Sequence, residues 1–201
     1  MSDLFSYDQS NTPIDPDEEA QLIPSLSTRA ELNAFELTNI LEARTWAMSP
    51  RRLRSINPAD ELFLRELHRR MFNKVWRWAG QYRTTMKTIG VEVHRVQSDI
   101  GALIADLRFW IENRTFPPIE LAARLHHRLV VIHPFCNGNG RHSRLFADIV
   151  AQKYWNVQLG WGAGTGDHKS IRDRYIEALR SADQNNFGPI IDFAGSGQIG
   201  N

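Results

Sequence analysis

The sequence predicts an all-α domain interrupted by one short β-hairpin. From Ser27 onward, apolar residues recur three or four positions apart, which is the spacing that places them on one face of a helix. The pattern is broken between Gly80 and Val96, where β-favouring residues lie on both sides of Gly90. We expect that interval to form the hairpin and the rest of the domain to be helical.

Successive helices are expected along the chain. Asn57 followed by Pro58 is typical of a helix start, because Asn caps free N–H groups and Pro suits the first turn. The apolar face of this helix runs to Trp78. Further helices are expected to begin near Ser98, near Pro117 and after Gly140, and the last one includes Ile171, Tyr175 and Leu179.

Size, charge and hydropathy exclude several classes of protein. The 201 residues are 42% hydrophobic and 23% charged, which fits one globular domain with a short extension. A formal net charge of +1 provides no broad basic surface, so direct nucleic-acid binding is not expected. No apolar run approaches the ~20 residues of a membrane span, and the start of the chain lacks a signal-peptide pattern. We therefore expect a cytoplasmic protein without membrane association.

The stretch from Ile132 to Arg144 carries the most chemical information, and it reads Ile-His-Pro-Phe-Cys-Asn-Gly-Asn-Gly-Arg-His-Ser-Arg. Pro134 disfavours the helical conformation at the residue before it, so the preceding helix should end at His133. An imidazole has a reference pKa of about 6.5 and can accept a proton near neutrality. His133 is therefore a candidate general base.

Two glycines alternate with two asparagines before the next helix begins. A glycine-rich turn at a helix N-terminus directs unpaired N–H groups toward one point, which suits a phosphate group. Arg141 and Arg144 would lie on one face of the first helical turn and could bind two phosphates. The alternative is an ordinary turn followed by solvated arginines, since Asn-Gly alone is a common turn signal.

The segment from His133 to Arg144 resembles the Fic family motif His-Pro-Phe-x-(Asp/Glu)-Gly-Asn-Gly-Arg-x-x-Arg, and one specified position departs from it. Residues 78–84 are similar to the segment that leads into the Fic flap, and residues 126–128 and 174–179 resemble the subgroup called mobile mystery protein B. The resemblance implies a Fic-type helical bundle with a β-hairpin flap beside the active-site loop.

The same resemblance implies a reaction: transfer of AMP from Mg-ATP to a Ser, Thr or Tyr hydroxyl of a target protein, with pyrophosphate leaving. His133 would deprotonate that hydroxyl. The phosphate ligands would be the main-chain amides of Gly138, Asn139 and Gly140 for the α- and β-phosphates, Arg141 for the β-phosphate and Arg144 for the γ-phosphate. ATP and Mg²⁺ are thus the expected substrate and cofactor.

The flap is expected at about residues 85–93. By resemblance it would hold an extended target segment through main-chain pairing, with Thr88, Ile89, Gly90 and Val91 as docking residues. Modification of the protein by itself is included in this expectation.

Asn137 is the departure from the motif, because the family usually has Asp or Glu there as a magnesium ligand. An amide oxygen can bind Mg²⁺ but brings no negative charge. Asn137 is therefore expected to be a weak metal ligand, with most of the metal affinity coming from the nucleotide phosphates. A slower enzyme, a different transferred group, or loss of activity remain open.

The segment from Ser27 to Asn33 resembles the inhibitory sequence Ser/Thr-x-x-x-Glu-Gly/Asn of many Fic proteins, although the match is imperfect. In that interpretation Glu31 would pair with Arg144 and occupy the γ-phosphate site. Glu36, on the same expected helix, is the rival residue. The alternative is a helix capping box, because Ser or Thr followed by Glu31 has the required spacing.

The domain boundaries follow from this interpretation. Residues 1–23 would form an N-terminal arm, 24–48 the inhibitory helix region, 49–195 the Fic catalytic domain and 196–201 a flexible tail. Two alternatives to AMP transfer stay open. One is transfer of UMP or phosphate; the other is a catalytically weak nucleotide-binding regulatory protein of a mobile element, acting with a DNA-binding partner protein.

Overall fold

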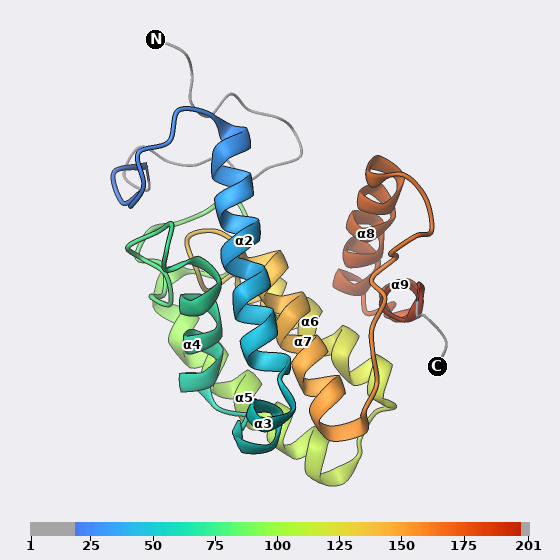
Figure 1. The fold of residues 1–201 in the computed structure, drawn as a ribbon. Helices are drawn as coiled ribbons and strands as arrows, with labels where there is room; N and C mark the ends of the chain where they lie inside the picture. The colour runs from blue at the N-terminus through green and yellow to red at the C-terminus, as the bar shows by residue number, and fades with distance from the viewer. Residues whose placement is uncertain (1–18, 198–201) are drawn as a thin grey trace.

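The structure, a computed structural model, describes residues 19–197, and the regular secondary structure of these residues is helical (Figure 1). The elements are α2 (Arg29–Met48), α3 (Pro50–Ser55), α4 (Glu61–Phe72), the 3-10 turn η1 (Val93–Arg95), α5 (Val96–Asn113), α6 (Pro118–Ile132), α7 (Asn139–Trp155), α8 (His168–Asp183) and α9 (Gly188–Gly195). The predicted arm and tail fall largely on residues 1–18 and 198–201, outside the described range.

Helices α6 and α7 form the centre of the domain, and the turn between them carries the sequence motif. Helices α2 and α4 pack on α7, α5 packs on α6, and α8 and α9 stand on the opposite side of the central pair (Figure 1). The fully buried large side chains of the main core include Phe72, Trp76, Phe135 and Phe146. The motif is thus anchored between the two most closely packed helices.

Helix α4 begins later than predicted. Its N-cap is Asp60, whose carboxylate accepts a main-chain N–H two residues further on (2.9 Å), whereas Asn57 accepts one in the preceding turn (3.1 Å). The helix ends at Phe72, so Trp78, expected on the same helical face, is buried from the turn that follows. The starts predicted near Pro117 and after Gly140 agree with α6 and α7 to within two residues.

The predicted β-hairpin is not formed. Residues 81–92 contain no strand, and their main chain pairs instead with the turn between α6 and α7. Tyr82 forms an isolated antiparallel bridge with Phe135, and the N–H of Val91 donates to the carbonyl of Ile132 (3.4 Å). The β-favouring residues find their partners in another segment rather than in each other, which a local sequence pattern does not reveal.

The helices differ widely in length, and the two shortest are not predicted from the sequence. The sequence pattern does not predict α3 or α9, because helices of 6 and 8 residues contain too few periods. Within residues 19–197, no helix is both long enough and apolar enough to cross a membrane.

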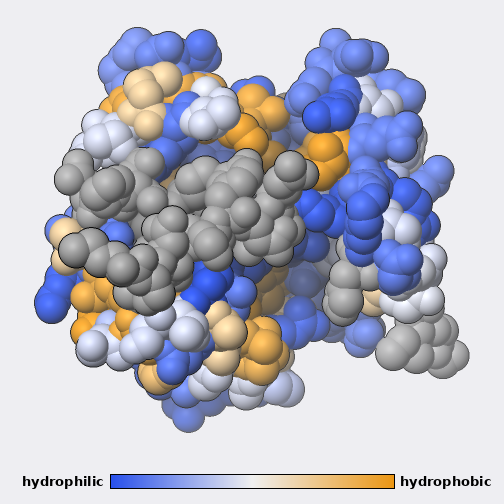
Figure 2. Space-filling model, turned by 90° about the horizontal axis from the view of Figure 1, so that it is seen from above, coloured by the Kyte–Doolittle hydropathy of each residue, from blue (hydrophilic) through white to orange (hydrophobic). Residues whose placement is uncertain are grey.

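Helices α8 and α9 form a unit beside the main body. They enclose a second apolar cluster that includes Ala178, Ile190 and Phe193. Seen from above (Figure 2), the surface is hollowed between the main body and the part that carries α8. The hollow opens at the end of the molecule where α2 and α8 begin (Figures 1 and 2).

Candidate active site

The turn between α6 and α7 is shaped by two residues in the left-handed conformation. As Pro134 predicts, α6 ends just before His133, which caps it with φ 52° and ψ 60°. Gly138 has φ 76° and immediately precedes α7. A Cβ at Gly138 would overlap the ring of Phe72, so only glycine fits this point of the turn.

The side chain of Asn139 holds the turn together. Its Oδ1 accepts the N–H of Phe135 (2.9 Å), and its Nδ2 donates to the carbonyl of the same residue (2.8 Å). Phe135 is fully buried, and its ring stacks on His68 with centroids 3.7 Å apart. Asn139 therefore clamps the loop with its side chain, whereas only its main-chain N–H was predicted to have a role.

The buried residues His68 and His142 support the turn, and neither is among the site residues predicted from the sequence. His68 accepts the N–H of Gly80 on Nδ1 (3.0 Å), so its Nε2 carries the proton that it donates to the carbonyl of Asn137 (3.1 Å). His142 bonds through Nε2 to the carbonyl of Leu64 (2.9 Å). Burial lowers the pKa of both histidines. Both histidines lie among apolar residues of the sequence, and that position could have indicated that they are buried.

Main-chain N–H groups are open at the start of α7. The first hydrogen bond within the helix runs from the N–H of His142 to the carbonyl of Gly138 (2.9 Å). Within residues 19–197, the N–H groups of Asn139, Gly140 and Arg141 have no acceptor, as expected for the first turn of a helix. The N–H of Gly138 is bonded to Oδ1 of Asn137 (2.6 Å). The turn thus offers an anion three open N–H donors, two of which belong to the predicted set.

His133 lies between the end of α6 and the flap. Its Nδ1 is buried without a well-formed hydrogen bond. Burial lowers the pKa of His133 to about 4, and the carbonyl of Val130 opposes that shift. The imidazole is therefore neutral at pH 7 and able to accept a proton.

Arg141 and Arg144 leave the first turn of α7 in different directions. Nη1 of Arg141 pairs with Oε2 of Glu36 on α2 (2.5 Å). The Nε of Arg144 donates to the carbonyl of Gly140 (3.3 Å), and its guanidinium lies over the ring of Tyr175 on α8 (5.1 Å). One arginine thus faces α2 and the other faces α8.

The carboxylate at the site comes from Glu36, the rival residue named above. Glu36 is only 4% exposed. Its Oε1 accepts the indole N–H of Trp76 (2.7 Å) while Oε2 pairs with Arg141. The contact is therefore with the first motif arginine, not with Arg144.

The predicted pairing of Glu31 with Arg144 is not formed. Oε2 of Glu31 accepts the N–H groups of Ser27 (2.8 Å) and Thr28 (3.0 Å), and the Thr28 hydroxyl accepts the N–H of Glu31 (3.2 Å). This is the capping box at the start of α2. The local spacing that resembles an inhibitory motif serves here to begin the helix.

Asn137 offers little to a metal ion. It is 8% exposed, and its Oδ1 is engaged by the N–H of Gly138. Among residues 19–197, no group of three His, Cys, Asp or Glu side chains is placed to hold a metal. The loop could supply one neutral oxygen to Mg²⁺, after that hydrogen bond is broken, and would rely on phosphate oxygens for the remaining ligands.

The flap lies directly against His133. Thr88, Ile89 and Gly90 are exposed, and Ile89 is 58% accessible. Val91 is half-buried and bonded to the end of α6. Gly90 has φ 125°, and a Cβ there would lie 2.8 Å from the Cβ of His133. Of the predicted docking residues, Gly90 therefore lies next to His133, and Val91 is bonded to the residue before it.

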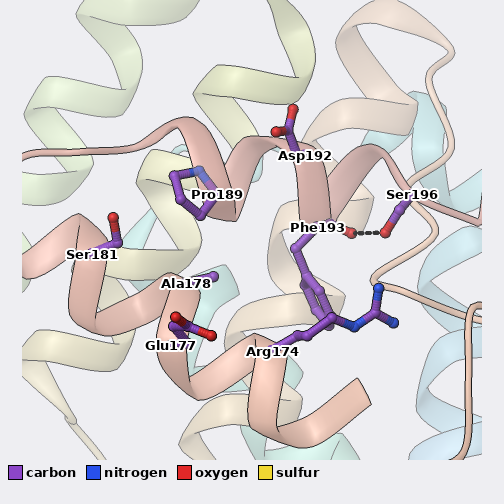
Figure 3. Close-up of a pocket in the computed structure, with 8 residues that line it drawn as sticks. All are labelled: Arg174, Glu177, Ala178, Ser181, Pro189, Asp192, Phe193 and Ser196. Carbon is purple, nitrogen blue, oxygen red and sulfur yellow. Dashed lines mark hydrogen bonds between the residues drawn. The ribbon is translucent and has the colours of Figure 1, made fainter. Parts of the chain in front are cut away.

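A groove between α8 and α9 lies apart from this site (Figure 3). It has a volume of about 370 Å³, and Arg174, Glu177 and Phe193 are among its lining residues. None of the motif residues lines it.

These features define a helical domain with a candidate phosphate-binding turn between its two central helices. Residues 58–151, which run from the turn before α4 into α7, match the family described as Fic/DOC. Residues 58–151 are therefore assigned to the Fic/DOC family. The similarity to the mobile mystery protein B subgroup stays a prediction.

Several known proteins are similar to this chain. It is 29% identical to the Aedes aegypti protein named Protein adenylyltransferase Fic over 147 residues, which are 69% of this chain and 28% of that protein. It spans only about a quarter of the length of the curated relatives it matches. The N-terminal Fic domain of a Bartonella quintana Bep effector protein with bound ADP has a TM-score of 0.66 at 19% identity, covering 96% of this chain and 93% of that one. For the Bartonella tribocorum BepC protein with bound AMPPNP, the TM-score is 0.66 at 18% identity, over 91% and 98%.

Proposed function

We propose that the chain is a Fic-type protein adenylyltransferase that transfers AMP from Mg-ATP to a Ser, Thr or Tyr hydroxyl of a target protein. The observation that carries the proposal is His133, a neutral imidazole in a turn that ends on open N–H groups at the start of α7. Relatives named Protein adenylyltransferase Fic support the reaction, and neighbours with bound ADP or AMPPNP support a nucleotide ligand.

His133 would act as the general base. Because its Nδ1 is buried, Nε2 is the nitrogen available to a substrate. Nε2 takes the proton of the target hydroxyl while the hydroxyl oxygen attacks the α-phosphorus. A P–O bond to AMP forms, and the bond to pyrophosphate breaks with its electron pair on the leaving oxygen. A base in this role contributes about 10²- to 10⁴-fold to the rate.

The start of α7 would bind the phosphates. The open N–H groups of Asn139 and Gly140 point out of a helix N-terminus, where the helix dipole favours negative charge. Arg141 and Arg144 flank this point from the α2 side and the α8 side. Arg141 would contact the β-phosphate and Arg144 the γ-phosphate.

Mg²⁺ would come with the nucleotide, and its role is to offset phosphate charge and make pyrophosphate a better leaving group. Asn137 would turn its amide oxygen away from the N–H of Gly138 to reach the metal. That rotation releases the Gly138 N–H, the third predicted phosphate ligand. Asn137 thereby links metal binding to completion of the phosphate site.

Glu36 would act as a brake on nucleotide binding. The carboxylate is buried and holds the arginine assigned to the β-phosphate. A nucleotide must displace it from Arg141 and must also tolerate its negative charge nearby. This assigns autoinhibition to Glu36 instead of Glu31, whose carboxylate is used in the capping box.

The flap would hold the target protein. Gly90 lies against His133, and the exposed residues Thr88, Ile89 and Gly90 would offer an extended segment a place to pair. A residue of a second copy of this chain could also enter the site, which would allow self-modification. No described contact bears on the predicted DNA-binding partner.

Mass spectrometry tests the proposal. Purified protein, alone and with a cell lysate, is incubated with Mg²⁺ and ATP, and peptides are searched for the added mass of AMP. His133→Ala is compared with His94→Ala, which alters an exposed histidine of η1. We expect the adduct with the wild type and with His94→Ala, and a loss of at least about 100-fold with His133→Ala.

Other outcomes identify the alternatives. A His133-dependent phosphate adduct, or a UMP adduct when UTP is supplied, would replace AMP transfer with another transfer reaction. Nucleotide binding without any His133-dependent adduct would favour a regulatory nucleotide-binding protein.

A further inference from the structure

Arg83 is a buried cation outside the sequence motif. It is 2% exposed, and within residues 19–197 it forms no ion pair with a carboxylate; its side-chain hydrogen bonds go to main-chain carbonyls. Burial of a charge is costly unless its hydrogen bonds are satisfied. The position of this guanidinium therefore indicates that the carbonyls around it need a donor.

The guanidinium joins the end of α6 to both ends of the flap. Nε donates to the carbonyl of His133 (2.6 Å), and Nη2 reaches the carbonyl of Ile132 (3.5 Å). Nη1 donates to the carbonyl of Thr85 (3.1 Å), and Nη2 also bonds to that of Val91. One planar fork thus closes the flap onto the residue that carries the base.

The conformation of His133 depends on these contacts. A φ of 52° is uncommon for a residue other than glycine. The last carbonyls of a helix lack a donor within the helix, and a cation suits that end of the dipole. Gly90 packs so closely that a Cβ there would lie 2.7 Å from Nη2 of Arg83 and 2.8 Å from the Cβ of His133. Imidazole, flap and guanidinium form one packed unit.

We infer that Arg83 is a positioning residue, which holds the flap against the end of α6 and so fixes the imidazole of His133 for the proton transfer. The effect of Arg83 on proton transfer rests on the proposed function. The flap contact and the state of the imidazole can be measured without any transfer activity.

Charge supplies a second connection between Arg83 and His133. Burial is the main cause of the lowered pKa of His133. The positive charges of Arg83 and Lys87 lower this pKa further, and the carbonyl of Val130 raises it. Burial lowers the pKa of Arg83, and the negative charge of Glu92 opposes that shift. Removing the guanidinium is therefore expected to raise the pKa of His133.

Three variants separate positioning from general stability. Arg83→Lys keeps the charge but loses the fork, and Arg83→Met loses both. Arg108→Lys is the matched control, because Arg108 also donates through Nε to a carbonyl, that of Ala59 (2.8 Å), on a different part of the domain. Each variant is first shown to be folded by circular dichroism and thermal unfolding.

Amide hydrogen exchange measures the flap contact. The N–H of Val91, bonded to the carbonyl of Ile132, is expected to exchange at least about tenfold faster in both Arg83 variants and unchanged in Arg108→Lys. An NMR titration of the His133 ring, assigned with His133→Ala, is expected to show a midpoint raised more by Arg83→Met than by Arg83→Lys.

Gly90→Ala provides a variant that leaves Arg83 in place, so the inference can be tested even where Arg83→Met does not fold. The added methyl group should free the flap and accelerate exchange at Val91 in the same way. Unchanged exchange at Val91 and an unchanged His133 midpoint in folded Arg83→Lys and Gly90→Ala would overturn the inference. For adenylyl transfer, Arg83→Lys should reduce kcat at least about tenfold with nucleotide Kd within about twofold. Absence of any adduct in the wild type would count against the proposed function alone.

Discussion

Replacement of Glu36 by Gln tests whether the contact between α2 and the motif restrains nucleotide binding. Glutamine keeps the size of the side chain and an oxygen that can accept the indole N–H of Trp76. It removes the negative charge that holds Arg141 at 2.5 Å. The substitution therefore frees the arginine and leaves the packing of α2 in place.

The size of the effect follows from the contact. A hydrogen bond to a charged group contributes about 1.5–3 kcal/mol, and solvent screening of a partly exposed arginine reduces this to about 1–2 kcal/mol. Arg141 is 39% exposed and Glu36 is 6% exposed at the side chain, so the reduced range applies. Because about 1.4 kcal/mol corresponds to tenfold in affinity, Mg-ATP should bind about 5- to 30-fold more tightly to Glu36→Gln. The free energy of unfolding should change by about 1 kcal/mol or less.

Calorimetric titration with Mg²⁺ and the analogue AMPPNP measures the affinity without turnover. Glu31→Gln is the matched control, because Gln also completes a capping box and Glu31 does not touch the motif. Its nucleotide affinity should equal that of the wild type. Weaker binding by Glu36→Gln would refute the brake and show that Glu36 holds Arg141 in the orientation that the nucleotide needs.

Three further predictions concern the turn itself. Asn139→Ala removes both hydrogen bonds to buried Phe135 and should lower the free energy of unfolding by about 2–4 kcal/mol in urea denaturation; a loss below about 0.5 kcal/mol would contradict the clamp. Gly138→Ala forces a Cβ into Phe72 and should destabilise the protein by more than about 1 kcal/mol, whereas an unchanged thermal midpoint would contradict the required glycine. Burial lowers the pKa of His142 to about 4, so the unfolded chain takes up a proton first and stability should fall as the pH drops from about 6.5 toward 4. Between pH 7 and pH 5 the loss from His142 is up to about 2 kcal/mol; His142→Asn should show a smaller pH-dependent loss, and an equal loss in both proteins would contradict the assignment.

Much of the fold and the centre of the site can be predicted from short-range pattern. Helical periodicity indicates α6 and α7, and the proline effect predicts the end of α6 at His133. The open N–H groups at the start of α7 follow from helix geometry alone. Each of these features is determined by residues that are close together in the sequence, so a local pattern is enough to predict it.

The features that sequence pattern misses depend on distant partners. Glu31 and Glu36 lie on the same helix, and only the packing of α2 on α7 decides which of them meets Arg141. The β-favouring residues around Gly90 pair with the end of α6. The N–H of Val91 donates to the carbonyl of Ile132, which lies 41 residues further along the chain. In the sequence, His68 looks like an ordinary helical residue. Its support of the turn depends on stacking against Phe135, which lies far away in the sequence.

The central claim is that the imidazole of His133 directs transfer of AMP, and the position of a radioactive label in ATP tests it most directly. With ATP labelled at the α-phosphate, we expect labelled protein, with the label lost in His133→Ala and kept in His94→Ala. With ATP labelled at the γ-phosphate, it predicts no labelled protein. Label transferred from the γ-phosphate, or α-label that persists at the wild-type level in His133→Ala, would contradict it.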